Sequence, residues 1–390
     1  ASNVSKNKEQ INWIVNSVCQ IQDWNNATSF TETVMLIGEK ITASTDKSLD
    51  DLRCTIYNFV CIDKGKLPTK LVALPLYFLL RTAYQVHSSS LRSSLTKYLI
   101  GLDNTLFESC HQLLLNTIDE SLDNQNVECC MEILSCFFNS FASRDRDPSY
   151  TVLLCRSLSK VLEHTRDLSS NPLAWRTFYI SLRKTLTECN WIFNQYSIEL
   201  TMTLITSAST LHKEKPIDVY SYQLLTQIMS YILLFHRHRL SSRHHIVFTV
   251  FTSLLEPLTI KNNSLDNVLS KSEVAAYAYS RLLSNLCEPQ TSPKSNQSNR
   301  EVEVSYTSAK IKKSLRNHIH VLLVHYIYVT LKFNFLTIII KEIEAGIFKV
   351  FDVLSTMELN LVNAQLDVAG RTYYRTLHQS YKDHGRWKDE

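Results

Sequence analysis

The sequence predicts an all-α protein, an irregular α-solenoid of the HEAT or armadillo type with about 14 to 16 stacked helices. Apolar residues recur every three or four positions along most of the chain, which is the period of one helix face. Polar and proline-containing breakers divide this pattern into segments of about 15 to 22 residues, the length of ordinary helices. Only six of the 390 residues are glycine, where average usage of roughly 7% predicts about 27. Glycine-rich phosphate loops are thereby excluded, and tight-turned β-sandwiches are disfavoured.

The clearest helical face of the first half lies between residues 127 and 141. Its apolar positions step by four, three, four and three, and are Val127, Met131, Leu134, Phe138 and Phe141. Cys129, Cys130 and Cys136 fall inside the same apolar pattern. The ten cysteines of the chain include no Cys-x-x-Cys pair, the usual spacing of zinc and redox sites. We therefore predict that these cysteines are small buried hydrophobic side chains in a reducing compartment.

Two strongly apolar helices are predicted in the second half, over residues 219–235 and 321–340. The first is shorter than the roughly 20 residues that a bilayer requires, and the second is interrupted by His325, Lys332 and Asn334. Both helices are therefore expected to be buried inside the protein, and no membrane contact is expected.

Two shorter signals refine this prediction. Ser355 followed by Glu358 matches a capping box, which predicts that a helix starts there. The strand-like alternation of Val302, Val304 and Tyr306 is too short to form a sheet.

The charge distribution divides the chain into two regions. Residues 1–200 hold 19 Lys and Arg against 21 Asp and Glu, whereas residues 201–390 hold 22 against 16. We predict a helical-repeat region over 1–200 and a C-terminal helical domain over 201–390. Residues 288–301 (EPQTSPKSNQSNRE) contain no large apolar side chain, so a mobile loop is expected there. The modest basic excess of the second region permits a polyanionic partner without demonstrating one.

Motifs that would indicate an enzyme or a bound metal are absent from the sequence, so no catalytic, cofactor-binding or metal-ligating residues are predicted. Asp145 and Asp147 alternate with arginines and indicate a charged turn. His318 and His320 would lie on different faces of a helix and would not converge on a metal. Glu344, like its neighbour Glu342, is expected to be solvated. Neither a cofactor nor a small-molecule substrate is expected.

The densest cationic stretch runs from residue 236 to residue 245 and joins two apolar helices. Arg237, Arg239 and Arg243 are the candidates for contact with RNA phosphates, because the planar guanidinium suits phosphate oxygens. A second interpretation is that these cations complement the C-terminal end of a helix dipole. The two interpretations are compatible, and the sequence does not choose between them.

The C-terminal segment combines a packing stripe with a basic face. On a helix, Tyr374, Leu377 and Tyr381 would share one side. The candidate partner surface consists of the cations that point elsewhere and of two residues beyond the helix, namely Arg371, Arg375, Lys382, Arg386 and Trp387.

This segment resembles the C-terminal domain of the Unhealthy Ribosome Biogenesis protein 2 family, also called the nucleolar pre-ribosomal-associated protein 2 family. The residues that match the family's terminal motif are Asn363, Ala364, Leu366, Asp367, Gly370, Arg371, Tyr381, Lys382, Gly385, Trp387 and Lys388. Arg386 stands where the family usually has lysine. Likeness over residues 280–289, which end in Cys287-Glu288-Pro289, and over 346–354 extends the resemblance to roughly residues 200–390. Members of that family are much longer, so a C-terminal piece is expected.

The resemblance implies a non-enzymatic scaffold in early assembly of the large (60S) ribosomal subunit and in pre-rRNA processing, located in the nucleus and nucleolus. The implied partners are a large helical-repeat nucleolar pre-ribosomal protein, a DEAD-box RNA helicase and other early pre-60S factors, with pre-rRNA as a further candidate. The alternative is a HEAT-type adaptor that binds protein segments and has no ribosomal role.

Overall fold

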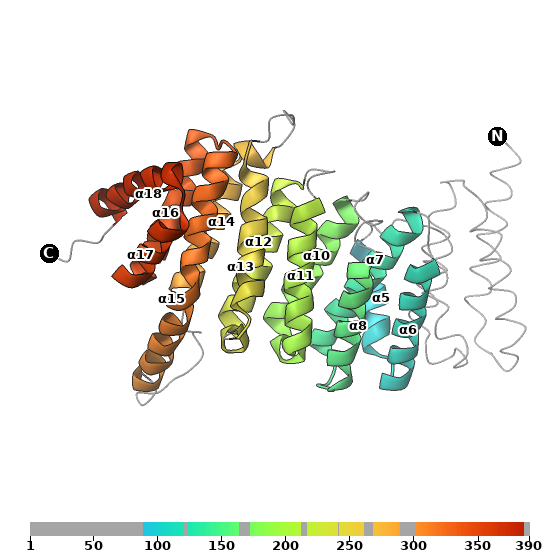
Figure 1. Ribbon diagram of the computed structural model, residues 1–390. Coiled ribbons are helices and arrows are strands. Elements are labelled where there is room, and N and C mark those ends of the chain that lie inside the picture. Colours follow the sequence, from blue (N-terminus) through green and yellow to red (C-terminus); the bar gives the residue numbers. More distant parts are fainter. Residues whose placement is uncertain are drawn as a thin grey trace, which may run out of the picture. The chain divides into compact units, whose positions relative to one another are not determined.

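The computed structural model describes residues 89–120, 124–163, 172–211, 217–240, 242–260, 268–288 and 301–385. These ranges contain 13 α-helices and no β-strand, which confirms the all-α prediction, although the expected count was slightly higher (Figure 1). The chain divides between Leu153 and Leu154 into two compact units. None of the helices in the described ranges is long and apolar enough to cross a membrane.

Aromatic side chains form the core of the described part of the first unit. Its helices are α5 (Ser89–Ile100), α6 (Asn104–Glu120) and α7 (Asn124–Ser140), and α7 packs against the other two. The rings of Phe107 and Phe137 lie 5.0 Å apart, and the guanidinium of Arg144 lies 4.2 Å from the centroid of the Phe107 ring. Cys129 and Cys130 are fully buried, as predicted. The expected helix over 127–141 is therefore confirmed, with its last residue in a short 3₁₀ turn.

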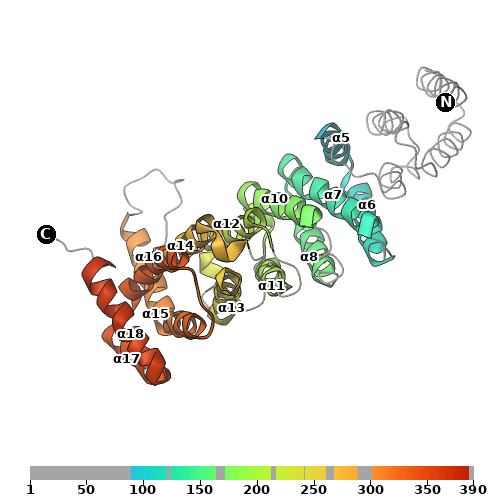
Figure 2. The ribbon, with the colours of Figure 1, turned by 90° about the horizontal axis from the view of Figure 1, so that it is seen from above.

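Helices of the second unit alternate between two layers, seen as two rows in Figure 2. One layer consists of α10 (Pro172–Glu188), α12 (Val219–Phe235), α14 (Glu273–Cys287) and α16 (Thr337–Val353). The other consists of α11 (Gln195–Leu211), α13 (His244–Leu255), α15 (Glu301–Lys332) and α17 (Thr356–Gln365). Each helix packs against the next one in its own layer. The chain also contains α8 (Ser149–Glu163), which crosses the division between the units, and α18 (Val368–Ser380) with a terminal π turn at Tyr381–Gly385.

A glycine permits the close contact between α14 and α16. A Cβ atom at Gly346 would lie 2.9 Å from both the Cα and the carbonyl oxygen of Ser280. Backbone atoms cannot move aside as a flexible side chain can, so any larger residue would push the two helices apart. One of the few glycines in the chain therefore fixes the distance between two core helices.

The second predicted apolar helix, over 321–340, is wrong as a single element. α15 ends at Lys332 and α16 begins at Thr337. Between them, the carbonyl oxygen of Asn334 accepts a hydrogen bond of 2.7 Å from the backbone N–H of Ile260, which holds the chain away from helical geometry. Apolar residues continue on both sides of the break, and the polar residues Lys332 and Asn334, which interrupt the pattern there, mark its position.

Four further sequence predictions concern the bounds of helices, loops and domains, and their outcomes differ. The strand-like alternation at 302–306 lies within α15, because a growing helix gains one backbone hydrogen bond per added residue. The predicted division between residues 200 and 201 falls inside α11. Most of the predicted mobile loop, residues 289–300, lies outside the described residues. The capping box of Ser355 and Glu358 is confirmed at the start of α17.

Candidate functional site

The arginine with the most contacts at the basic corner is Arg237, in the 3₁₀ turn Arg237–Leu240 that follows α12. Its Nη1 donates to the carbonyl oxygen of Leu286 at 2.8 Å, and its Nη2 donates to that of Asn285. Its Nε donates to the carbonyl oxygen of Leu233 at 3.3 Å. The last carbonyls of a helix have no partner within that helix. Arg237 therefore caps the C-terminal end of α14 and joins it to α12.

The two other candidate phosphate ligands also bond within the chain. Arg239 Nη1 donates to the carbonyl oxygen of Phe193, and Arg243 Nε lies 2.6 Å from Glu199 Oε1. The hydrogen bond from Gln195, followed by that from Arg243, lowers the pKa of the Glu199 carboxyl. The interpretation that these cations complement the C-terminal end of a helix therefore holds for Arg237. RNA contact by Arg237, Arg239 and Arg243 stays a prediction.

Two of the histidines at this corner, His236 and His244, are shielded from solvent to different degrees. His236 is only 5% exposed, and burial, with a smaller contribution from Arg239, lowers its pKa to about 4. It is therefore neutral at physiological pH and adds no positive charge there. The rings of His244 and His318 stack with their centroids 4.7 Å apart, between α13 and α15. Burial, and then the neighbouring His318, lower the pKa of His244.

Metal ligands do not converge in the part of the chain that the structure describes, where no group of three or more His, Cys, Asp or Glu side chains could hold an ion. One sequence prediction about acidic residues needs correction. Glu344 was expected to be solvated, but it is half-buried beside α15 and α18, and burial raises its pKa.

The terminal motif builds the turn between α17 and α18. Asp367 is the N-cap of α18, and its Oδ1 accepts a hydrogen bond of 2.7 Å from the backbone N–H of Gly370. A Cβ at Gly370 would lie 2.9 Å from that same oxygen. Arg371 Nε donates to the carbonyl oxygen of Asn363 at 2.9 Å, at the end of α17. Several residues that carry the resemblance therefore have a structural role in this helical junction.

The face of α18 opposite this packing remains open. The predicted stripe is confirmed, since Tyr374 and Leu377 are buried and the Tyr381 hydroxyl donates to Asp352 Oδ1 at 2.6 Å. Arg375 and Lys382 are exposed, and no hydrogen bond or ion pair holds them among the described residues. Arg371 is exposed as well, whereas Arg386 and Trp387 lie outside the described residues. Partner contact by this surface stays a prediction.

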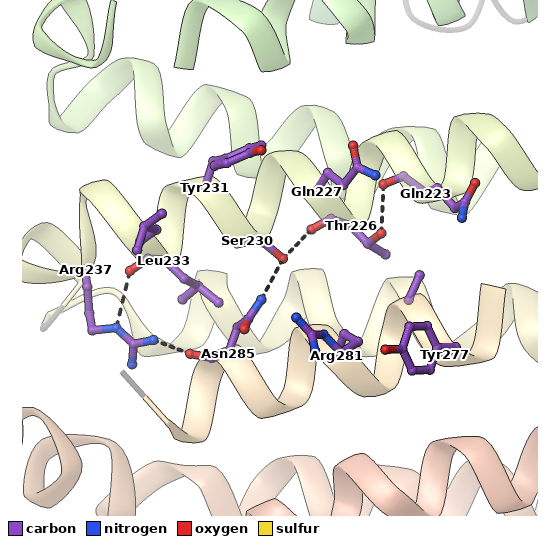
Figure 3. A pocket seen from close by; sticks show the side chains of 12 residues that line it. Gln223, Thr226, Gln227, Ser230, Tyr231, Leu233, Arg237, Tyr277, Arg281 and Asn285 are labelled. Atoms are coloured by element: carbon purple, nitrogen blue, oxygen red, sulfur yellow. Dashed lines mark hydrogen bonds between the residues drawn. The ribbon is translucent and has the colours of Figure 1, made fainter. Parts of the chain in front are cut away.

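A groove between α12 and α14 was not anticipated from the sequence. Its cavity volume is about 420 Å³, and its lining includes Gln223, Gln227, Ser230, Tyr231, Arg237, Tyr277, Arg281 and Asn285 (Figure 3). Asn285 Nδ2 donates to Ser230 Oγ at 3.2 Å, which ties the two helices together. The available signal was a pair of polar residues four apart on each helix. Their juxtaposition depends on which helices become neighbours.

The corner, the groove and α18 all lie within one region that resembles known proteins. A sequence model of the Urb2/Npa2 family matches residues 177–390, which is more than half of the chain. No curated protein and no solved structure matches the chain.

Proposed function

The chain belongs to the Urb2/Npa2 family of ribosome biogenesis factors, and on this premise we propose that it is a non-enzymatic scaffold in early assembly of the large (60S) ribosomal subunit and in pre-rRNA processing. The observation that carries the proposal is the family match over residues 177–390. This role places the protein in the nucleus, and within it in the nucleolus.

The arrangement of the second unit supports a scaffold role. Two layers of helices, each packed on the next of its layer, are the building principle of an irregular α-solenoid. Such a stack buries its core between the layers and leaves both outer faces for partners. We extend the proposal to this fold, with the helical stack as a platform on which assembly factors dock.

Exposed cations on α18 and on the π turn that follows it support a role for this segment in partner binding. Arg371, Arg375 and Lys382 lie on the side away from the core and can meet acidic surfaces of a pre-ribosomal particle. We propose a large helical-repeat nucleolar protein, a DEAD-box RNA helicase and other early pre-60S factors as partners. Pre-rRNA phosphates are a further candidate ligand of the basic corner.

Affinity purification of the tagged chain from cells tests the proposal. We expect pre-60S proteins and the 27S pre-rRNA to co-purify. The variant Arg375→Glu/Lys382→Glu should recover at least about five-fold less of these partners, because it reverses two exposed charges. Arg156→Glu is the matched control, since Arg156 is exposed on α8 and should leave recovery unchanged.

Other outcomes of the purification would contradict the proposal. Recovery of transport or trafficking factors without pre-ribosomal proteins would instead support a HEAT-type adaptor with no ribosomal role. Equal recovery with the double variant and the wild type would remove α18 from the partner surface.

For RNA, Arg239→Ala/Arg243→Ala should weaken crosslinking to pre-rRNA and reduce its dependence on salt.

A further inference from the structure

We propose that the groove between α12 and α14 binds an extended peptide segment that carries acidic side chains. The groove lies on the layer formed by α10, α12, α14 and α16, on a part of the chain separate from α18. The inference goes beyond the ribosomal role and does not depend on it, because it rests on the side chains of the groove itself.

Polar side chains in the groove have a spacing that suits an extended chain. Gln223 and Gln227 are four residues apart on α12, and Arg281 and Asn285 are four residues apart on α14 (Figure 3). Four residues of helix span about 6 Å. Two residues of an extended chain span roughly 6.6 Å. Gln223 offers both donors and an acceptor, whereas Gln227 Oε1 already accepts a hydrogen bond of 2.6 Å from Arg183 Nη1, so that Gln227 offers the donors of its Nε2. Together these two amides can pair with alternate peptide groups of a segment laid along the groove.

The positive charge of the groove favours a peptide segment with acidic side chains. The residues that line it include two arginines and no aspartate or glutamate. Arg237 is already bonded to the end of α14. Arg281 is exposed, and within the described residues its guanidinium makes no hydrogen bond or ion pair. A carboxylate on the bound segment would therefore meet a guanidinium that is free to form a bidentate pair.

Tyrosine rings add apolar surface to the rim. Tyr277 is 54% exposed beside Arg281, and Tyr231 stacks on Phe235 with a centroid distance of 6.0 Å. Exposed tyrosines bring large contact area at low entropic cost, which is typical of peptide-binding surfaces. An apolar residue next to each acidic residue of the segment would use these rings.

The number of available cations favours a peptide over RNA. Every nucleotide of RNA brings a phosphate, and affinity for single strands comes largely from neutralising several of them. Among the lining residues, only Arg281 has a guanidinium that is not already engaged. The amide side chains match peptide groups better than a row of phosphates.

Fluorescence anisotropy with the purified full chain tests the inference. The probe is a fluorescein-labelled nonapeptide of alternating glutamate and valine. The comparison probes are the same peptide with glutamine in place of glutamate, and a nine-nucleotide oligouridine. We expect the glutamate peptide to bind at least about ten-fold more tightly than the glutamine peptide.

Two variants separate charge from backbone recognition. Arg281→Glu should weaken binding of the glutamate peptide at least about ten-fold, whereas Arg156→Glu should change it less than about two-fold. Gln223→Met removes an amide without a charge and should weaken both peptides to a similar degree. Both substituted side chains reach solvent, and circular dichroism will confirm that the helices persist.

The inference fails if the glutamate and glutamine peptides bind equally, or if Arg281→Glu leaves binding of the glutamate peptide intact. It also fails if oligouridine binds in an Arg281-dependent manner and the peptide does not, which would identify a nucleic-acid groove. None of these outcomes bears on co-purification with pre-60S proteins, so failure of this inference and failure of the proposed function are distinguishable.

Discussion

The two basic regions of the second unit use their cations in opposite ways. At the corner after α12, Arg237, Arg239 and Arg243 all bond to atoms of the chain itself. On α18 and the π turn that follows it, Arg375 and Lys382 are exposed and make no such bond among the described residues. The corner lies where helices end and carbonyl oxygens lack partners, so Arg237 caps α14 there, while Arg243 pairs with the carboxylate of Glu199. A dense run of positive charge in a sequence is therefore no measure of the charge available to a partner.

The largest expected effect on stability comes from removing the cap that Arg237 forms on α14. Arg237→Met should lower the free energy of unfolding by roughly 4 kcal/mol, because it removes charge-assisted hydrogen bonds to partly buried carbonyls. Arg375→Met on α18 should change it by less than about 0.5 kcal/mol. Urea denaturation of the two variants measures the contrast, and equal losses would show that the corner and α18 do not differ in this respect.

A pH effect comes next and also distinguishes the regions. The pKa of His236 is about 4 in the folded chain, below its ordinary value of 6.5. As pH falls below 6.5 the unfolded chain binds the extra proton first, so stability decreases until about pH 4 and then levels off. Between pH 7 and pH 5 this group should account for about 2 kcal/mol of lost stability.

Replacement of the histidine should flatten that profile. His236→Phe removes the proton-binding group while keeping an aromatic ring of similar size against Phe193. His378→Phe on α18 is the matched control and should flatten the profile less, because His378 is only half-buried. Denaturation midpoints recorded every half pH unit provide the test. If His236→Phe shows the same pH slope as the wild type, the pH dependence of stability does not come from His236.

A smaller effect is expected at the junction of α17 and α18. Asp367→Ala removes the N-cap of α18 and should cost about 1 kcal/mol, whereas Asp367→Asn keeps a capping oxygen and should cost less. Hydrogen exchange should then accelerate in the first turn of α18. If exchange speeds up equally in α12, the loss is global and the cap does not act locally.

The smallest effect on stability concerns the half-buried pair of Arg243 and Glu199. Glu199→Gln should destabilise the chain by less than about 1 kcal/mol at neutral pH, because both side chains contact solvent. The folded pKa of Glu199 lies below its ordinary value of 4.5, so the stabilisation is present above pH 4.5 and is lost as pH falls through the folded pKa. Denaturation at pH 7 and pH 3 checks this, and an equal difference at both values would contradict it.

Sequence patterns within one or two helical turns predicted the helices most reliably. The apolar spacing over 127–141 and the capping box at Ser355 each correspond to observed features, because both depend on residues within one or two turns. The break at Asn334 depends on a backbone hydrogen bond to Ile260 in a different part of the chain. The polar residues Lys332 and Asn334 interrupt the apolar pattern there, but they do not show that the helix ends.

The sites were harder to predict than the elements. The exposed cations of α18 followed from helical spacing, because a single buried stripe fixes which side of a helix faces out. At the corner, the sequence identified the arginines but did not show to which groups they donate hydrogen bonds. The groove went unnoticed because Gln223 and Arg281 are unremarkable on their own helices.

By itself, the amino-acid sequence determined that this chain is helical, where several helices begin and which family it belongs to. Only the tertiary structure determined which groups the polar side chains contact. Arg237 meets Leu286, which lies 49 residues further along the chain, only because α12 and α14 are neighbours in one layer. A helix pattern records which face is apolar, but the partner of each polar group is set by long-range packing, and that packing separates a structural arginine from one that remains free to bind.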